Sequence, residues 1–151
     1  ETTAPEIIRD TAGGVDIFVA GMGTTGTLMG CSRYFRERHP KTKVVGIEPT
    51  LNHRIQGLKN MQESIVPSIY DPTQLDRKLT CNDDDAFELF RDLAQREGLF
   101  CGLSSGAALW GGIEAAKDLP RGSTVVVLFA DRGDRYLSTE AFRSVCALCP
   151  P

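Results

Sequence analysis

The sequence predicts an α/β fold with an open, mostly parallel sheet and helices on both faces. Three observations predict it: short apolar runs that end in glycine or proline, segments of helical periodicity, and the regular alternation of the two. The chain has 151 residues, of which 41% are apolar and 25% are charged, as is typical of one globular domain. Disordered, collagen-like and fibrous classes are therefore excluded.

The first half of the chain contains a strand, a helix and a strand in succession. Residues 15–20 form an apolar run that leads into glycines, as a buried strand does before a loop. From 27 to 38 the apolar residues recur at helical spacing and charged residues fill the other faces. Residues 43–48 form the next apolar run, which Pro49 ends. Together these segments predict a βαβ unit.

The second half continues the alternation. Residues 51–74 lack a clear period and predict a long loop with at most one short helix. A helix is expected over 84–97, with acidic residues in its first turn, and a short strand over 99–102. A third helix begins at 104–106, where two serines can cap it, and 124–130 is a strongly β-branched strand.

Charge and apolar patterning limit the classes of partner. The net charge of −3 argues against broad binding of nucleic acid or of an anionic membrane. The longest apolar run, 125–130, is far shorter than the ~20 residues of a spanning helix. No basic or apolar leader is visible at the start of the sequence, and we expect these residues to be a piece of a longer chain. A cytoplasmic location is expected from the cysteines, which are odd in number and scattered.

The five cysteines do not predict a disulfide framework or a metal site. They are odd in number and scattered, which favours a reducing compartment. Cys146 and Cys149 have the spacing of half a zinc site, but no second pair of ligands matches them. We therefore predict no metal ligand.

A glycine- and threonine-rich segment, 21–27, joins the first strand to the first helix. Glycines allow backbone amides to turn toward one point, and the helix that follows directs its positive end there, at about 0.3–1 kcal/mol for each contact with an anion. We interpret the segment as an anion cradle, the simpler alternative being a tight turn. It also satisfies G-x-G-x-x-G, and Glu48 ends the second strand where a dinucleotide-binding fold has its ribose-binding acid. The residues alone leave both readings open.

A second motif, 102–107, also joins a strand to a helix. One serine could cap the helix and leave the other for a ligand, or both could be caps. A serine nucleophile is not supported, because His39 and His53 are the only candidate bases and neither lies in a triad-like context.

The third motif, 131–139, is a charged loop after the last strand. Taken alone, it is a solvated turn or an internal ion-pair cluster.

These motifs together resemble the pyridoxal-phosphate-dependent cysteine synthases, specifically the cysteine synthase B type (O-acetylserine sulfhydrylase B). The resemblance covers nearly the whole chain and is carried by residues 2–7, 22–27, 97–106 and 131–139. The strings M-G-T-T-G-T and D-R-G-D-R-Y-L-S-T are its most specific parts. The chain departs from the family at Ala4, where the family has glycine, and after Phe142.

The resemblance implies a fold like that of the tryptophan synthase β-subunit (fold type II), present here in part. It assigns the phosphate of the cofactor, pyridoxal 5′-phosphate, to the Gly-Thr loop and the pyridine nitrogen to the second motif. It assigns substrate contact to the long loop. The residues concerned are Gly23, Thr24, Thr25, Gly26, Thr27 and Ser104 for the cofactor, and Gln56, Gly57 and Lys59 for the substrate.

The resemblance also places the lysine that binds the cofactor in an amino-terminal half that this chain lacks. Residues 1–151 are then the carboxyl-terminal half, mainly the large cofactor-binding domain, with no catalytic residue of their own. We expect this fragment to be inactive alone and to expose a broad apolar face that the missing half covers.

The implied reaction is a β-replacement in which O-acetylserine or O-phosphoserine and sulfide give cysteine and acetate or phosphate. A homodimer is expected, with no nucleic-acid or membrane partner. Two alternatives stay open: a nicotinamide-dinucleotide-binding domain of an oxidoreductase, and a non-catalytic regulatory relative of the sulfhydrylases.

Overall fold

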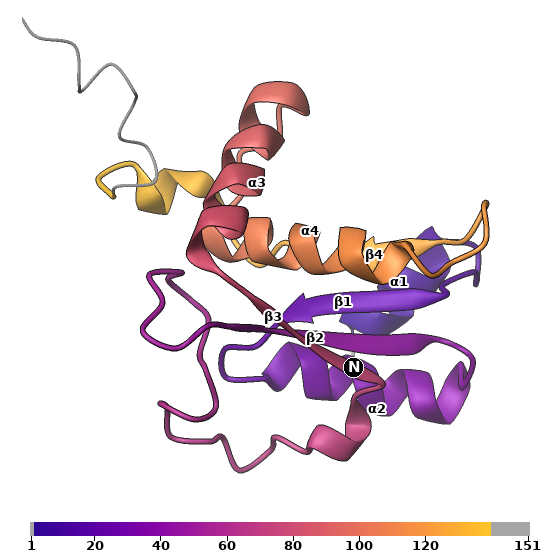
Figure 1. Cartoon of the computed structure of the whole chain (residues 1–151). Coiled ribbons are helices and arrows are strands. Elements are labelled where there is room, and N and C mark those ends of the chain that lie inside the picture. The colour runs from indigo at the N-terminus through magenta and orange to yellow at the C-terminus, as the bar shows by residue number, and fades with distance from the viewer. Residues whose placement is uncertain (1, 140–151) are drawn as a thin grey trace, which may run out of the picture.

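Four parallel strands form a single open sheet in the computed structural model, which describes residues 2–139 (Figure 1). The strand order is β3-β2-β1-β4, and every pairing is parallel. The strands are β1 (Ile17–Gly21), β2 (Lys43–Pro49), β3 (Arg77–Cys81) and β4 (Val125–Val127). The chain thus moves from β1 outward to β2 and β3, and then returns to the other side of β1 for β4.

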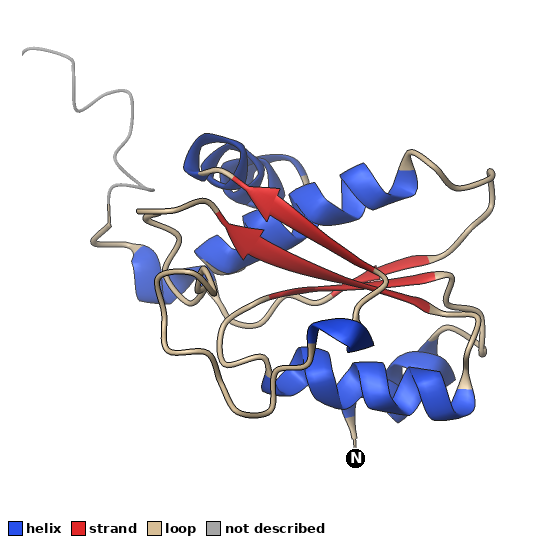
Figure 2. Ribbon diagram, turned by 60° about the horizontal axis from the view of Figure 1, so that its bottom comes forward, coloured by secondary structure: helices blue, strands red, loops and turns tan. Residues whose placement is uncertain are grey.

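Helices cover both faces of this sheet (Figure 2). On one face lie α1 (Thr3–Asp10) and α2 (Gly26–Arg38), and on the other lie α3 (Asp83–Arg96) and α4 (Leu103–Ala116). Two short 3₁₀ helices, η1 (Pro72–Gln74) and η2 (Gly133–Tyr136), lie in the connecting segments. The predicted fold class, a parallel α/β sheet with helices on both faces, is confirmed.

The core has one layer on each side of the sheet because successive side chains of a strand point to opposite faces. Ile17 and Val19 of β1 belong to the layer under α3 and α4, whereas Phe18 and Ala20 belong to the layer under α1 and α2. Helix α4 lies close to the sheet, since a Cβ added to Gly111 would overlap the Ile47 side chain. The strands are therefore held firmly where the first loop leaves β1.

Most of the predicted elements occur within one or two residues of their predicted bounds. The βαβ unit is confirmed, and α3 begins as expected, with the Asn82 side chain as its N-cap accepting a hydrogen bond from the amide of Asp85. The strand predicted over 124–130 is shorter, because its ladder with β1 ends at Val127.

The strand predicted over 99–102 is wrong. That segment contributes only an isolated antiparallel bridge between Cys101 and Arg132. The segment lies outside the four-stranded sheet, and Leu99 and Phe100 remain partly exposed.

One strand and one α-helix were not predicted, and neither was the short 3₁₀ helix η2. Strand β3 has the sequence RKLTC and lies at an edge of the sheet, so it lacks the apolar run of a buried strand. Helix α1 has only eight residues, too few for its periodicity to be distinctive. No helix within residues 2–139 has the length and apolar character needed to cross a bilayer.

Candidate functional site

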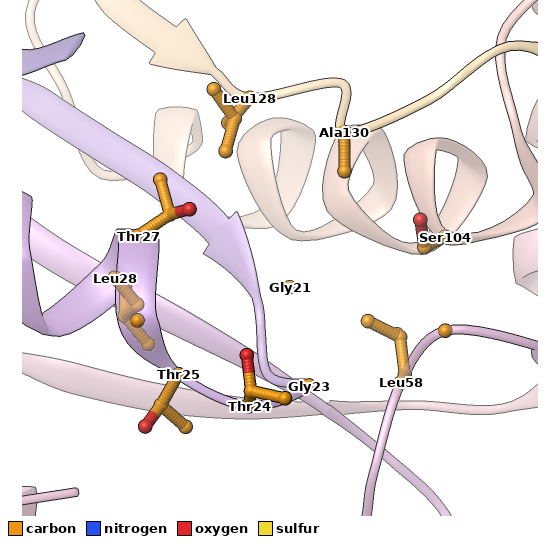
Figure 3. A pocket seen from close by; sticks show the side chains of 12 residues that line it. Gly21, Gly23, Thr24, Thr25, Thr27, Leu28, Leu58, Ser104, Leu128 and Ala130 are labelled. Carbon is orange, nitrogen blue, oxygen red and sulfur yellow. The ribbon is translucent and has the colours of Figure 1, made fainter. Parts of the chain in front are cut away.

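The candidate site is a pocket of about 170 Å³ at the carboxyl ends of β1 and β4 (Figure 3). The chain leaves β1 toward one side of the sheet and reaches β4 on the other, so this is the point where the strand order reverses. Ligands of open α/β sheets bind at such points, outside the carboxyl ends of the strands. Four separate segments form its walls: the loop 21–28, Gly57 with Leu58, Ser104, and Leu128 with Ala130.

The loop after β1 presents the start of α2 to the pocket. Thr25 has a left-handed backbone, with φ of 62°, and α2 begins at Gly26. Within residues 2–139, no side chain caps this helix, so its first amides keep their capacity to bind a ligand. Backbone amides and the helix dipole together make this end favourable for an anion.

A close backbone approach explains one of the loop glycines. A Cβ on Gly23 would lie 2.6 Å from the Gly57 carbonyl oxygen, which is backbone and cannot rotate away. Gly57 itself has φ of 91°, a conformation that glycine adopts readily and other residues rarely do. The two loops therefore meet at a pair of glycines in the pocket wall.

The three threonines of the loop differ in orientation. Figure 3 shows the Thr24 and Thr27 hydroxyls turned toward the open space in front of Gly21, while the Thr25 oxygen points away from it. The Thr25 side chain is buried, and its hydroxyl has no hydrogen-bond partner among the described residues. Thr24 and Thr27 are thus the hydroxyls that a pocket ligand can reach directly.

Ser104 lies across the pocket from the loop, in the first turn of α4. The prediction that the serines cap this helix is wrong, because Gly102 is the N-cap and α4 has no side-chain cap from residues 2–139. Ser104 is 8% exposed and lines the pocket. Ser105 is fully buried outside the lining, and its hydroxyl has no partner within the described chain.

The segment predicted to contact substrate enters the pocket only in part. Gly57 and Leu58 line it, whereas Gln56 and Lys59 do not. The Lys59 amide donates to the Met22 carbonyl at 2.7 Å, which ties this segment to the loop after β1. The structure therefore brings Gly57, of the three predicted substrate residues, together with the cofactor residues.

Glu48 does not take the position that a dinucleotide-binding acid requires. That interpretation needs an exposed carboxylate beside the glycine loop, but Glu48 is only 3% exposed. Its Oε2 forms an ion pair with Lys78 at 2.8 Å, and its Oε1 accepts a hydrogen bond from the amide of Met61 at 2.8 Å. Both oxygens are engaged within the fold.

The charged loop after β4 folds back behind the start of α4. The Gly102 amide donates to the Asp131 carbonyl at 2.9 Å, and the Tyr136 hydroxyl donates to Asp131 Oδ2 at 2.6 Å. Burial, reinforced by this hydrogen bond, raises the pKa of Tyr136 to about 12. The contact between Arg132 and Asp134 is a solvated surface pair at 3.4 Å. The loop thus combines a buried polar contact with an exposed turn.

The sequence did not identify the apolar side chains that line the pocket, which are Leu28, Leu58, Leu128 and Ala130. Leu128 and Ala130 follow the last predicted strand, and the carboxyl end of a parallel strand is itself a signal for a site. The signal could not be used because it requires knowing that β4 lies beside β1.

The pocket is small for a complete ligand site. Its volume of about 170 Å³ lies below the roughly 300–1,000 Å³ of common small-molecule sites. A pocket of this size accommodates only part of a ligand. Among residues 2–139, no cluster of three or more His, Cys, Asp or Glu side chains could hold a metal ion.

Amides at a helix start, two threonine hydroxyls and a facing serine are typical of the class of protein that binds a phosphate-bearing ligand beside a parallel sheet. Comparison with protein families identifies which one. The family described as pyridoxal-phosphate dependent enzyme matches residues 1–131, and the chain belongs to this family.

Cysteine synthases are among its most similar relatives. The chain is 40% identical to cysteine synthase B of Pseudomonas aeruginosa over 141 residues, which are 93% of this chain and 47% of the relative. It is 43% identical to cysteine synthase B of Salmonella typhimurium, over 93% of this chain and 46% of that protein. The chain spans about half the length of the curated relatives it matches.

Solved structures agree with this assignment. The crystal structure of O-ureido-L-serine synthase superposes with a TM-score of 0.88 at 37% identity, covering 95% of this chain and 48% of that one. Cysteine synthase of Entamoeba histolytica superposes with a TM-score of 0.86 at 33% identity, covering 93% of this chain and 44% of that one. The predicted fold type II and the predicted dependence of the family on pyridoxal phosphate are confirmed.

Proposed function

We propose that the protein to which this chain belongs is a cysteine synthase. It replaces the β-substituent of O-acetylserine or O-phosphoserine with sulfide, giving cysteine and acetate or phosphate. The single observation that carries the proposal is the uncapped, threonine-bearing start of α2 facing Ser104 across a pocket at the reversal point of the sheet. The similarity to cysteine synthases over more than nine-tenths of the chain supports it.

The residues of the pocket fit a pyridoxal 5′-phosphate cofactor. We assign the phosphate to the amides of Gly23, Thr24, Thr25, Gly26 and Thr27, and to the hydroxyls of Thr24 and Thr27. A helix start without a side-chain cap from the described residues is chemically suited to a dianion that accepts several hydrogen bonds. When bound, the cofactor supplies the electron withdrawal that allows loss of the substrate's α-proton and β-substituent.

We assign the pyridine nitrogen to Ser104. A hydroxyl is neutral and can donate a hydrogen bond to a ring nitrogen that carries no proton, whereas a carboxylate would hold that nitrogen protonated. A ring left unprotonated withdraws electrons less strongly, which suits β-replacement better than transamination. Ser105, which lies outside the lining, has no role in this assignment.

Substrate contacts are assigned to the segment that includes Gln56, Gly57 and Lys59. Gly57 already forms pocket wall, and the other two flank the Gly57–Leu58 pair in sequence. In this proposal the Lys59 ammonium attracts the phosphate of O-phosphoserine, since it is a cation on the segment next to the cofactor site.

We further propose that residues 1–151 are the carboxyl-terminal half of the enzyme and that the cofactor-binding lysine lies in the other half. No lysine among residues 2–139 lines the pocket. The pocket lining includes Leu128 and Ala130, which follow β4, and on β4 itself Val125, Val126 and Val127 are each only partly buried. The β4 edge is the surface we assign to the complementary half. The homodimer and the cytoplasmic location are proposed from the family resemblance and the composition.

Activity measurements on two forms of the protein test this function. The protein of the complete reading frame is expected to bind pyridoxal phosphate and to form cysteine from sulfide and O-acetylserine or O-phosphoserine, while the 151-residue chain alone gives no turnover. Turnover by the chain alone, or a complete protein that binds no cofactor, would contradict the proposal. Bound cofactor without turnover would instead indicate a regulatory relative.

Ser104 and Ser105 offer a matched pair of variants. Ser104→Ala is expected to lower kcat/KM of the complete protein by about 10- to 100-fold, the effect of leaving one buried hydrogen-bond partner unsatisfied. Ser105→Ala removes a hydroxyl without a partner in the described chain and is expected to leave kcat/KM unchanged. Equal effects of the two substitutions would contradict the assignment of Ser104.

A further inference from the structure

Glu48 is a buried carboxylate near the end of β2 that has no place in the pocket lining. Its two oxygens reach in different directions. Oε2 pairs with the Lys78 ammonium of β3, and Oε1 accepts the amide of Met61, in the segment after the pocket wall. The side chain of Lys78 is 40% exposed and that of Glu48 only 4%. The carboxylate of this ion pair is therefore shielded from water, while the ammonium group stays partly solvated.

The segment that Glu48 holds is bonded to the sheet at three successive residues. The Lys59 amide donates to the carbonyl of Met22, the Asn60 amide side chain donates to the carbonyl of Pro49 at 2.8 Å, and the Met61 amide donates to Glu48. All three acceptors lie at the carboxyl ends of β1 and β2. Met61 is the only one of the three whose acceptor is a charged side chain.

Gly57 and Leu58 lie directly before these three residues and form one wall of the pocket. They approach the opposite loop closely: the Gly57 carbonyl lies against Gly23, and Leu58 Cδ2 lies 2.5 Å from the site a Cβ would occupy on Gly21. A shift of this segment would therefore change the shape of the pocket where the two loops meet.

A carboxylate in this position must be paired to remain buried, because a lone charge away from water is strongly unfavourable. Lys78 supplies the pairing charge and leaves Oε1 free for the Met61 amide. A hydrogen bond to an ionised acceptor is stronger than one between neutral groups, which suits an anchor for a segment without regular structure.

We propose that Glu48 is a positioning residue, which through the Met61 amide holds Gly57 and Leu58 as the pocket wall facing the phosphate cradle. This inference rests on the proposed function, since the wall matters only if the cofactor occupies the pocket. The structure thereby gives Glu48 a role that its sequence position, which suggested a ribose contact, does not reveal.

The test compares Glu48→Ala, Glu48→Gln and Glu63→Ala in the protein of the complete reading frame. Glu63 is the control, because its Oε1 accepts a backbone amide, that of Asn52 at 2.8 Å, in the same long loop but outside the pocket lining. Amide hydrogen exchange of residues 56–61 is measured without cofactor, with residues 17–21 as the internal reference. The affinity for pyridoxal phosphate is then measured by absorbance and fluorescence titration.

Glu48→Ala is expected to raise exchange of 56–61 at least tenfold, leave 17–21 unchanged, and weaken cofactor binding tenfold or more. Glu48→Gln keeps an oxygen that can accept the Met61 amide, so both quantities should return to within about threefold of wild type. Glu63→Ala should leave cofactor affinity unchanged. If Glu48→Ala does not fold, Glu48→Asp retains the charge with a shorter reach and should raise exchange of 56–61 at least threefold.

Unchanged exchange of 56–61 together with wild-type cofactor affinity in Glu48→Ala, or in Glu48→Asp if it is used, would overturn the inference. So would a rise in exchange shared equally by 17–21 without recovery in Glu48→Gln, since that pattern reports a purely structural role. A wild-type protein that binds no pyridoxal phosphate would overturn the proposed function, while the exchange measurement would still decide whether Glu48 anchors the segment.

Discussion

Strands β1 and β4 are neighbours in the sheet with similar sequences and very different burial. Ile17 pairs with Val125, Phe18 with Val126 and Val19 with Val127. The three β1 residues are at most 5% exposed, while all three valines of β4 are only partly buried. A strand of a parallel sheet is buried when it has a neighbour on each side and helices on each face. Within residues 2–139, β4 has only one neighbour, β1.

The opposite edge of the sheet shows that an exposed edge need not be apolar. Strand β3 presents Arg77 and Lys78, which pair with Asp118 at 3.0 Å and with Glu48. Charged residues on an edge strand discourage further pairing, whereas an apolar β-branched edge invites it. The difference between the two edges supports the proposal that a complementary half packs against β4.

The largest expected effect comes from the paired residues Val19 and Val127. In the 151-residue chain, Val19→Ala should lower the free energy of unfolding by about 2–3 kcal/mol, because two buried methyl groups are lost and a cavity remains. Val127→Ala should cost about 1 kcal/mol, because its methyl groups are already partly in water. Urea unfolding measures both.

The same pair sharpens the comparison in the complete protein. If the other half covers β4, the cost of Val127→Ala should rise there toward that of Val19→Ala. If the two substitutions lower the free energy of unfolding equally in the isolated chain, the β4 edge is not the surface that the other half covers.

A smaller effect is expected at alkaline pH and should arise on the β4 side. Burial and the hydrogen bond to Asp131 raise the pKa of Tyr136 from 10.0 to about 12. Because the folded-state pKa is the higher one, this stabilisation is complete below pH 10 and is lost as the pH rises through about 12. Between about pH 9 and about pH 11 the stability that Tyr136 contributes should change by about 1.4 kcal/mol.

Unfolding of wild type and Tyr136→Phe, followed over this pH range, isolates that contribution. The variant lacks the ionisable hydroxyl, so the pH dependence of its stability should differ from that of wild type by this amount. Parallel curves for the two proteins would exclude Tyr136 as the source.

The smallest effect concerns thiol reactivity. Burial raises the pKa of Cys31 to about 11 and that of Cys81 to about 12, and both side chains are almost inaccessible. Cys101, beside the β4-side loop, also has a raised pKa but is partly exposed. A disulfide reagent should therefore label Cys101 first.

The labelling is best done with Cys146 and Cys149, which lie outside the described residues, replaced by serine. Mass spectrometry then gives the order of modification. Earlier reaction of Cys31 in α2, or of Cys81 at the end of β3, would mean that these elements open more readily than the β4 side.

The sequence was most informative where structure is local. The cradle at 23–27 could be predicted because strand, glycines and helix follow one another directly, and the structure places all of it in one pocket wall. Ser104 was singled out from Ser105 by the family resemblance, and the structure places Ser104 in the pocket lining. The prediction that the serines cap α4 was wrong, because Gly102 is the N-cap of that helix.

Features that depend on distant segments could not be predicted. Leu128 and Ala130 enter the site only because β4 returns beside β1. Glu48 was open to a dinucleotide interpretation because its partner, Lys78, lies on an edge strand whose polar sequence gave no sign of a strand. The entry of Leu128 and Ala130 into the pocket and the pairing of Glu48 both depend on strand order and burial, which residue type alone does not reveal.

The pocket walls come from positions as far apart in sequence as Gly21 and Ala130. During synthesis the chain therefore has no complete version of this pocket until β4 has left the ribosome and joined β1. The cofactor cannot guide the early steps of assembly, and it can stabilise only molecules in which the sheet is already closed at this edge. Cofactor supply would then determine how long finished molecules persist, and would have little influence on how fast they form.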